Sequence, residues 1–178
     1  MFIVEKIPEH KILKSPNIEK ISTYGINLTS HHFGLNFDYD DFPNDFIYEF
    51  SSEYLGSPLL QMSVIRPDGV KIDLLSTSVP YSNVKTIHSE SIFSTDDAIT
   101  KNLSFQSEKF EFTFERLSAE DIVFSKIQTN EPLKGDYSFS IDLYGVNSEN
   151  QIHESKLIIG GKAFGIMGTD ELRRDLAI

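Results

Sequence analysis

The side chains in this sequence that are best suited to chemistry and closest together are a histidine pair and a run of aspartates. His31 and His32 are adjacent, and Asp38, Asp40 and Asp41 follow within ten residues. Imidazole and carboxylate groups bind divalent metals in proteins, so a metal site is one interpretation of the segment. Adjacent strand residues point to opposite faces, however, and only a loop would direct both rings at one ion. We therefore expect the histidines to lie in a solvated loop without a metal.

The aspartates can also be compared with a calcium-binding loop. Asp38 and Asp40 have the alternate spacing of such loops. Phe42 and Pro43, however, occupy positions where an EF-hand needs an oxygen ligand and then a glycine. The sequence therefore favours an acidic loop that faces solvent, and we expect neither a metal nor a cofactor.

Aromatic and acidic residues dominate residues 37–54, a segment that we call the aromatic–acidic strip. The strip contains no lysine or arginine. Its rings offer a surface on which a sugar or peptide can stack. Alternation along a strand directs about half of the rings into a core, so a binding face and core packing are both open interpretations. The candidate binding residues are Tyr39, Phe42, Tyr48 and Tyr54.

Motifs of common catalytic sites are absent from the sequence. There is no Gly-x-Ser-x-Gly nucleophile elbow, no His-Glu-x-x-His zinc motif and no Gly-x-x-x-x-Gly-Lys-Ser/Thr phosphate loop. The chain has no cysteine, which excludes disulfides, thiolate metal sites and a cysteine nucleophile. Carboxylate pairs are too frequent in so acidic a chain to indicate acid–base catalysis. We expect a protein that is not an enzyme.

The charge balance restricts the possible partners. The 178 residues include 27 acidic and 16 basic ones, which gives a net charge of −11. Non-specific nucleic-acid binding and docking on anionic lipid both need basic surfaces, so we expect neither. N-glycosylation sequons begin at Asn27 and Asn102, which are candidate acceptors if the chain is exported.

Short segments in which apolar and polar residues alternate must position the candidate site residues. Apolar residues alternate on both sides of an Arg-Pro-Asp-Gly sequence at 66–69, which predicts a β-hairpin with a tight turn. Capping residues at 94–97 and 118–121 predict the starts of short helices. Further alternating or apolar segments that predict strands are 46–50, 84–88, 110–114, 135–145 and 157–159.

Many short strands without a long helical pattern predict a mainly β fold, an immunoglobulin-like antiparallel β-sandwich. Leu133, Gly135 and Tyr137 have the spacing of the tyrosine corner of such sandwiches, in which a tyrosine hydroxyl bonds to upstream backbone. The expected parts are an irregular, extended arm over 1–20, with one edge strand as an open alternative, the β-sandwich domain over 21–160, and a lead-in with a short helix start over 161–178.

The most specific pattern is Gly-Thr-Asp-Glu-Leu-Arg-Arg-Asp-Leu at residues 168–176. It resembles a segment of the dipeptide/oligopeptide/nickel class of ABC-importer permeases, roughly Gly-Thr-Asp-x-x-Gly-Arg-Asp-hydrophobic, which precedes a membrane helix. Arg173 stands where the family pattern has glycine. A threonine or aspartate is also a natural N-cap for a helix start. The matching positions are Gly168, Thr169, Asp170, Arg174, Asp175 and Leu176.

The order of the Ile-Arg-Pro-Asp-Gly-Val hairpin, a Gly-Asp-Tyr strand and a Gly-Lys-Ala-Phe-Gly lead-in also resembles the large external insertion of some archaeal members. The resemblance implies the extracytoplasmic domain of a permease subunit in an importer of peptides or similar small solutes. The protein would lie in the cell membrane through spans absent from this chain. The implied partners are an external solute-binding protein, a second permease subunit and cytoplasmic ATPase subunits.

The alternative hypothesis comes from another functional class. A secreted or surface adhesion module would bind glycan or protein through the aromatic–acidic strip, residues 37–54. Substitution of the strip's rings would then abolish binding without unfolding the domain. The importer hypothesis instead expects contact with the solute-binding protein or the channel mouth.

Overall fold

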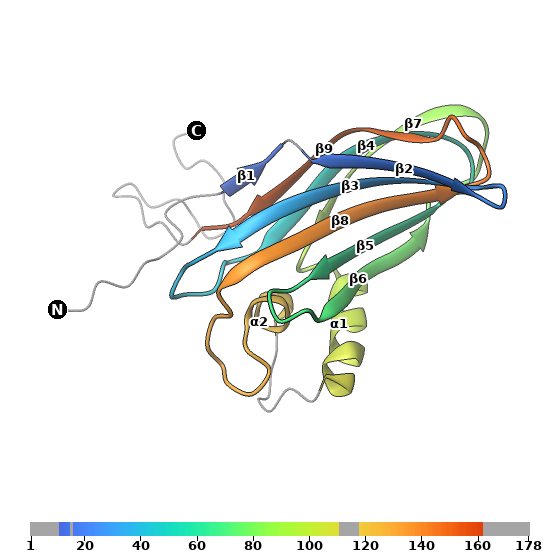
Figure 1. Ribbon diagram of the computed structural model, residues 1–178. Helices are drawn as coiled ribbons and strands as arrows, with labels where there is room; N and C mark the ends of the chain where they lie inside the picture. Colours follow the sequence, from blue (N-terminus) through green and yellow to red (C-terminus); the bar gives the residue numbers. More distant parts are fainter. Residues whose placement is uncertain (1–10, 15, 111–117, 162–178) are drawn as a thin grey trace, which may run out of the picture.

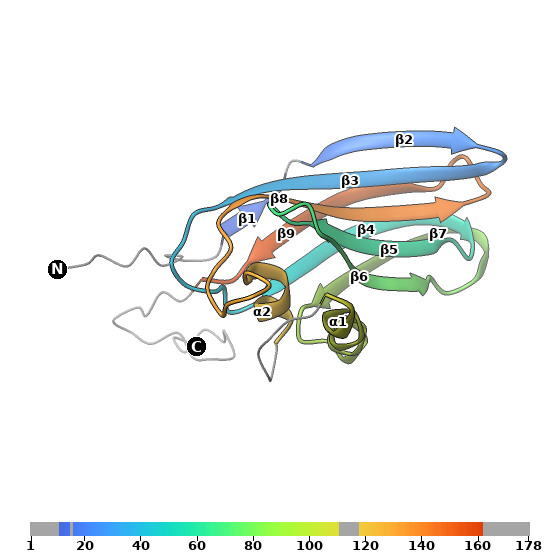
Figure 2. The ribbon, with the colours of Figure 1, turned by 60° about the horizontal axis from the view of Figure 1, so that its bottom comes forward.

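The computed structural model describes residues 11–14, 16–110 and 118–161, which form two antiparallel sheets packed face to face (Figures 1 and 2). In order across sheet A, the strands are β1 (Lys11–Leu13), β9 (Gln151–Ile159), β4 (Phe46–Gly56) and β7 (Ser82–Phe93). Across sheet B they are β2 (Asn17–Thr23), β3 (Ile26–Phe37), β8 (Gly135–Gly145), β5 (Leu59–Ile65) and β6 (Lys71–Ser78). The predicted antiparallel β-sandwich is confirmed.

The strand order is that of a jelly roll, in which Greek keys wind the chain back and forth between two sheets. The chain changes sheet at every connection except the hairpins β2–β3 and β5–β6. The tyrosine corner expected of an immunoglobulin-like sandwich is also present. The hydroxyl of Tyr137 donates a hydrogen bond of 2.7 Å to the carbonyl of Leu133.

Two helices lie in the connection from β7 to β8 and flank β5 and β6 (Figure 1). They are α1 (Asp97–Lys109) and α2 (Ala119–Phe124). The predicted capping box is confirmed, because Ser118 and Asp121 each bond the other's backbone amide through the side chain. Helix α1 is longer than expected and buries Ile99 and Leu103. Within the described residues, no helix has the length and apolarity needed to cross a membrane.

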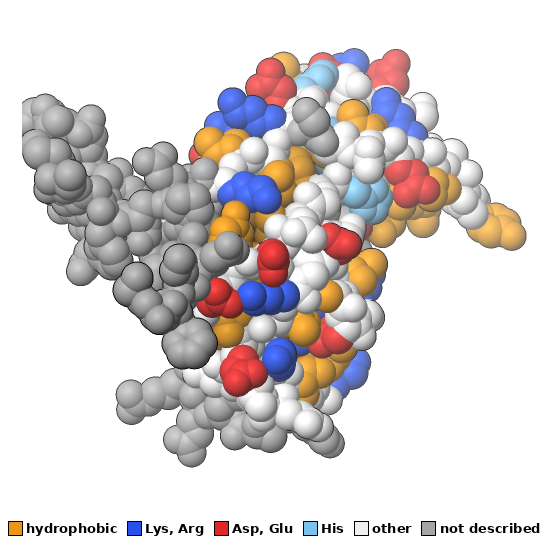
Figure 3. All heavy atoms as spheres, turned by 60° about the vertical axis from the view of Figure 1, so that its left-hand side comes forward, with side chains coloured by type: hydrophobic (Ala, Val, Ile, Leu, Met, Phe, Trp, Pro, Cys, Tyr) orange, Lys and Arg blue, Asp and Glu red, His pale blue; other side chains and the backbone are white. Residues whose placement is uncertain are grey.

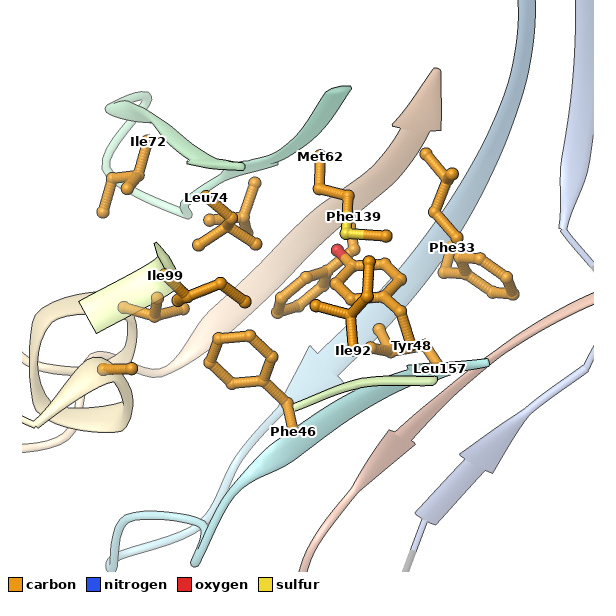
Figure 4. Close-up of a cluster of buried hydrophobic side chains, with 14 of the residues drawn as sticks. Phe33, Phe46, Tyr48, Met62, Ile72, Leu74, Ile92, Ile99, Phe139 and Leu157 are labelled. Atoms are coloured by element: carbon orange, nitrogen blue, oxygen red, sulfur yellow. The ribbon is translucent and has the colours of Figure 1, made fainter. Parts of the chain in front are cut away.

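Aromatic rings from both sheets and from α2 fill the core. Figure 4 shows Phe46 and Tyr48 of β4 directed toward Phe139 of β8, and the ring centroids lie 6.0 and 6.2 Å from that of Phe139. Phe124 at the end of α2 is fully buried, and its ring centroid lies 4.9 Å from that of Phe37. The short helix α2 is therefore part of the core.

The predicted hairpin at 66–69 is confirmed, and it also holds α2. Gly69 has a φ of 83°, the left-handed conformation that glycine adopts without strain. Arg66 in the same turn is buried, and its guanidinium bonds the Asp68 carboxylate at 2.7 Å. The guanidinium also donates to the carbonyl of Ile122 in α2 at 2.7 Å. One arginine therefore ties the turn to the helix.

The N-terminal arm expected over 1–20 contains strands. β1 pairs with β9, and β2 forms a hairpin with β3. Every residue of β2 is exposed, so its sequence has no hydrophobic period that would predict a strand. The sandwich therefore begins before residue 21, the boundary that composition suggested. The strand expected over 110–114 lies outside the described residues except for Phe110, which is the C-cap of α1.

Candidate functional site

A groove of about 910 Å³ extends over the outer face of sheet A. Tyr48 and Phe50 of β4 are buried in the core, so the alternating residues Glu49 and Ser51 face outward into the groove. The serines of the floor are small, which leaves the sheet backbone close to the surface. The outward-facing residues of the groove floor are Glu49 and Ser51 on β4, Ser89 and Ser91 on β7, and Glu154 and Lys156 on β9.

The link from β1 to β2 forms a wall of the groove. β1 is only three residues long, and the chain then crosses to the other sheet. Lys14 and Pro16 from this crossing line the groove, together with Ile18 of β2. Pro16 has no backbone N–H, so it cannot continue the pairing of β1 along β9. The wall is therefore a direct result of the early end of β1.

Two open strand edges border the groove. β1 pairs with β9 only across Leu157–Ile159. Among the described strands, none pairs with this side of β9 from Gln151 to Lys156. β2 is the last of the described strands of sheet B, so within that part of the chain it also has one edge without a neighbouring strand. Such edges present backbone N–H and C=O groups that a further strand can pair with.

The groove carries charges of both signs. Lys156 and Glu49 form an ion pair of 2.8 Å across β9 and β4. Lys14 and Glu154 also line the groove, and neither forms an ion pair within the part of the chain that the structure describes. A ligand with both a carboxylate and a cationic group therefore meets complementary charges. Figure 3, which views the molecule from one end, shows acidic and basic side chains interspersed on that face as well.

His31 lies at the inner corner of the groove. It is 1% exposed, and its Nδ1 is 2.6 Å from the hydroxyl oxygen of Ser155 on β9. Burial lowers the pKa of His31 and the neighbouring His32 lowers it further, whereas the backbone of Ile152 acts in the opposite direction. The ring is therefore neutral near pH 7 and joins the two sheets through a hydrogen bond without charge.

The expectation that both histidines lie in a solvated loop is wrong. His31 and His32 lie in β3, because that strand pairs along its length with β8 and along its first half with β2. Their rings point to opposite faces, and His32 is 3.4 Å from the carboxylate of Glu19. Among residues 11–14, 16–110 and 118–161, no three His, Asp or Glu side chains gather around a common metal position.

The aspartates that follow do form an acidic loop between β3 and β4, as predicted. Lys134 lies 2.6 Å from the carboxylate of Asp40 and 3.7 Å from that of Asp38. The hydrogen bond to Asp40 is the main cause that raises the pKa of Lys134. The loop is thus tied to the segment that precedes β8.

Two of the candidate binding residues in the aromatic–acidic strip are core residues, which corrects the sequence-based assignment. Tyr48 is 0% exposed and Tyr54 is 3% exposed, so neither ring can stack on a partner. The Tyr54 hydroxyl donates to the carbonyl of Pro80 at 2.7 Å. Tyr39 and Phe42 are half-buried and pack against the core. The adhesion hypothesis therefore keeps only these two partly exposed rings.

Both sequon asparagines bond neighbouring backbone through the atom that a glycan would modify. Nδ2 of Asn27 in β3 donates to the carbonyl of Val146 at 3.1 Å. Nδ2 of Asn102 in α1 donates to the carbonyl of Asp73 at 2.6 Å. The C-terminal motif residues Gly168, Thr169, Asp170, Arg174 and Asp175 lie outside the described residues.

The sequence did not predict the groove. Serine and charged residues that alternate with core residues on β4, β7 and β9 have the same pattern as any solvated sheet face. The groove depends on the early end of β1 and on the crossing at Pro16, both of which follow from long-range pairing. The only local signal is the pair of prolines at positions 8 and 16, which indicated interruption of the arm.

Comparisons with known proteins add no identification. No family model and no curated protein match the chain. Similarity is found to the enzymatically active domain of tailspike protein 4 of bacteriophage CBA120, with 7% identity over 88% of this chain and 19% of that chain, and a TM-score of 0.33. A CBM4 structure has 8% identity over 85% of this chain and 89% of that chain, with a TM-score of 0.23.

A chain in the structure of infectious bursal disease virus, Gx strain, is also similar, with 9% sequence identity over 89% of this chain and 38% of that chain and a TM-score of 0.27. The chain therefore spans less than half of the tailspike and bursal virus chains. TM-scores this low support no inference about fold or function.

Proposed function

We propose that this chain is the extracytoplasmic domain of a permease subunit in an ABC importer for peptides or similar small solutes. The observation that carries the proposal is the pattern at residues 168–176, where six positions match the family segment at fixed spacing. In that family the segment precedes a membrane helix. The protein would lie in the cell membrane, with this domain on the outer side, and would itself do no chemistry.

The route of the chain into and out of the sandwich supports the proposal. Lys11 at the start of β1 is opposite Ile159 at the end of β9. Facing residues of antiparallel strands have Cα atoms about 5 Å apart. A domain inserted in a loop between two membrane helices needs its ends close together, and this pairing supplies that geometry.

The opposite end of the sandwich has the character of a contact surface. The β2–β3, β6–β7 and β8–β9 connections lie there, at the right of Figure 1, far from β1 and from the end of β9. Tyr24, Tyr81 and Val146 in these connections are 101%, 75% and 83% exposed. Exposed apolar side chains at a domain end are suited to protein contact. We propose that this end docks or orients the solute-binding protein, which delivers solute to the channel formed with the second permease subunit and the ATPase subunits.

The test is deletion of the domain from the complete permease. A short glycine–serine linker should replace residues 11–161, because the paired ends need only a short connection. We expect the transporter to assemble, with weaker affinity for the solute-binding protein and slower uptake. Unchanged uptake together with unchanged affinity would refute the docking role.

A second measurement tests the family assignment itself. The full-length protein should contain an apolar stretch of about 20 residues on each side of this domain. Cysteine residues placed in the otherwise cysteine-free domain should react with an impermeant maleimide added outside intact cells. Labelling only after the cells are lysed would contradict the extracytoplasmic location.

A further inference from the structure

The open edge of β9 offers a place for one additional short strand. Regular pairing of β9 with β4 runs from Glu154 to Ile159. The register shifts between Ser51 and Ser52, where β9 contains His153 as an extra residue. Such a bulge bends a strand and limits further pairing. On the open side, the regular edge is therefore Glu154–Lys156, bounded by the bulge at one end and by β1 at the other.

The two faces of this edge would present different groups to an added strand. Glu154 and Lys156 point outward with the serine floor, whereas Ser155 points inward beside His31. Ile18 of β2 lies on the far side. An occupant would therefore meet polar groups on its outer face, and its inner face would lie beside the buried His31–Ser155 hydrogen bond. Strand addition of this kind obtains affinity from backbone hydrogen bonds and specificity from alternate side chains.

The charges favour one orientation of the occupant. Lys14 follows the last residue of β1, so it lies at the end of the open edge that β1 closes. It has no ion-pair partner among the described residues. A cation at this position attracts a carboxylate. Glu154, at the bulged end, attracts a cation. We propose that the groove binds a short extended peptide that adds as a strand to Glu154–Lys156 of β9, with its free C-terminal carboxylate beside Lys14.

This inference does not depend on the proposed function, because it concerns the isolated domain and no transport assay enters its test. The probe is a pool of randomised tetrapeptides with free termini, added at millimolar total concentration to the ¹⁵N-labelled domain. We expect amide shifts at residues 154–156 of β9 and at Lys14, Asn17 and Ile18. Two control pools have the same composition, one with N-methylated backbone amides and one with C-terminal carboxamides. Strand addition predicts that the first control loses the shifts and that the second weakens binding severalfold.

A blocking experiment uses the absence of cysteine in the chain. Glu154→Cys modified with a bulky maleimide should lose binding of the free-terminus pool, whereas Glu108→Cys on α1, modified in the same way, should retain it. Circular dichroism and the chemical shifts of core amides show whether each labelled variant is folded. Retained binding in labelled, folded Glu154→Cys would overturn the site.

Three other outcomes would also overturn the proposal. The first is the absence of shifts with the free-terminus pool. The second is equal shifts with the N-methylated pool, which cannot form the backbone ladder. The third is concentration-dependent dimerisation of the domain that perturbs residues 154–156 without any peptide, because the edge would then belong to a second copy of the chain.

Discussion

Helix α1 lies along β6 at one margin of the sandwich. At the other margin β9 borders a groove, and none of the described strands lies beside Gln151–Lys156 on that side. At the covered margin, the side-chain amide of Gln106 accepts from the backbone N–H of Asp73 at 3.0 Å and donates to the carbonyl of the same residue. Asn102 also donates to that carbonyl at 2.6 Å. Two side chains of α1 thus bond the edge of β6 much as a neighbouring strand would.

The contrast indicates which edge is available for recognition. An unpaired strand edge invites association, and proteins commonly cover it or interrupt it. In the part of the chain that the structure describes, side-chain amides of α1 bond the edge of β6. The edge of β9 is bounded by the bulge and by β1 and has no neighbouring strand between them. A covered edge contributes to stability, whereas a short open edge beside a groove retains backbone groups for a partner.

The largest expected effect on the side of the molecule that the helices cover is the loss of stability in Phe124→Ala. The ring of Phe124 contacts Phe37 and Phe139 in the core, with centroids 4.9 and 6.1 Å away. We expect a loss of about 3–5 kcal/mol in the free energy of unfolding, measured with urea. Phe105→Ala on α1 is the matched control, because that ring is 74% exposed, and it should change stability by less than about 0.5 kcal/mol. Equal losses would show that α2 is not part of the core.

Tyr137→Phe tests the connection that enters β8 next to α2. The substitution keeps the buried ring but removes the hydroxyl that bonds the carbonyl of Leu133. We expect a loss of about 1–3 kcal/mol, because the carbonyl loses its partner in a partly buried position. Tyr81→Phe, with a ring that is 75% exposed, is the control and should be neutral in the same unfolding measurement. A neutral Tyr137→Phe would mean that water replaces the hydroxyl.

Gln106→Ala would make the covered edge resemble the open one. The backbone of Asp73 would lose both hydrogen bonds to the Gln106 side chain. We expect a loss of about 0.5–1.5 kcal/mol in stability and faster hydrogen exchange at the Asp73 amide. Lys101→Ala, exposed on the same helix, should leave that amide unchanged. Unaltered exchange in Gln106→Ala would show that the helix protects β6 without this side chain.

The pH dependence of stability tests the open side through His31. Its folded-state pKa is lowered chiefly by burial, whereas the unfolded chain has the ordinary value of about 6.5. Above that pH, both states are neutral and the histidine has no effect. As pH falls below it, the unfolded state binds a proton before the folded state does, so the free energy of unfolding decreases.

The comparison is between the natural chain and His31→Asn, with urea unfolding at about pH 7.5 and 5.5. Asparagine does not titrate, so the decrease between the two pH values should be smaller in the variant. Besides burial, the groups that influence the pKa of His31 are His32, the backbone of Ile152 and Lys20. An identical decrease in both chains would assign the pH dependence to other residues.

Local patterns predicted most of the fold. The turn at 66–69, the strand at 135–145 and the cap at Ser118 were all readable because their backbone geometry depends on neighbouring residues. Strand β2 could not be predicted from the sequence, because all of its residues are exposed and its apolar residues show no periodicity. Tyr48 and Tyr54 were wrongly assigned to a binding face, because alternation shows that one face of a strand is buried but does not say which face.

The groove and the edges could not be predicted in the same way. They depend on which strands are neighbours, such as Lys11 with Ile159 and Asp73 with Gln106, and these contacts join distant parts of the chain. A serine on β4 or β7 has no local feature that distinguishes a groove floor from an ordinary solvated surface. Recognition surfaces of this kind become visible only when the strand order is known.

The pairing of β1 with β9 also has a mechanical consequence. Tension between the two ends of the domain would act first on the facing residues Lys11 and Ile159, at the end of a ladder of three pairs. In this geometry the pairs separate one after another and do not share the load. β1 would therefore detach at low force while the rest of the jelly roll stayed folded. Detachment of β1 would lengthen the segment that connects the domain to the rest of the protein. It would also leave this edge of β9 unpaired as far as Ile159.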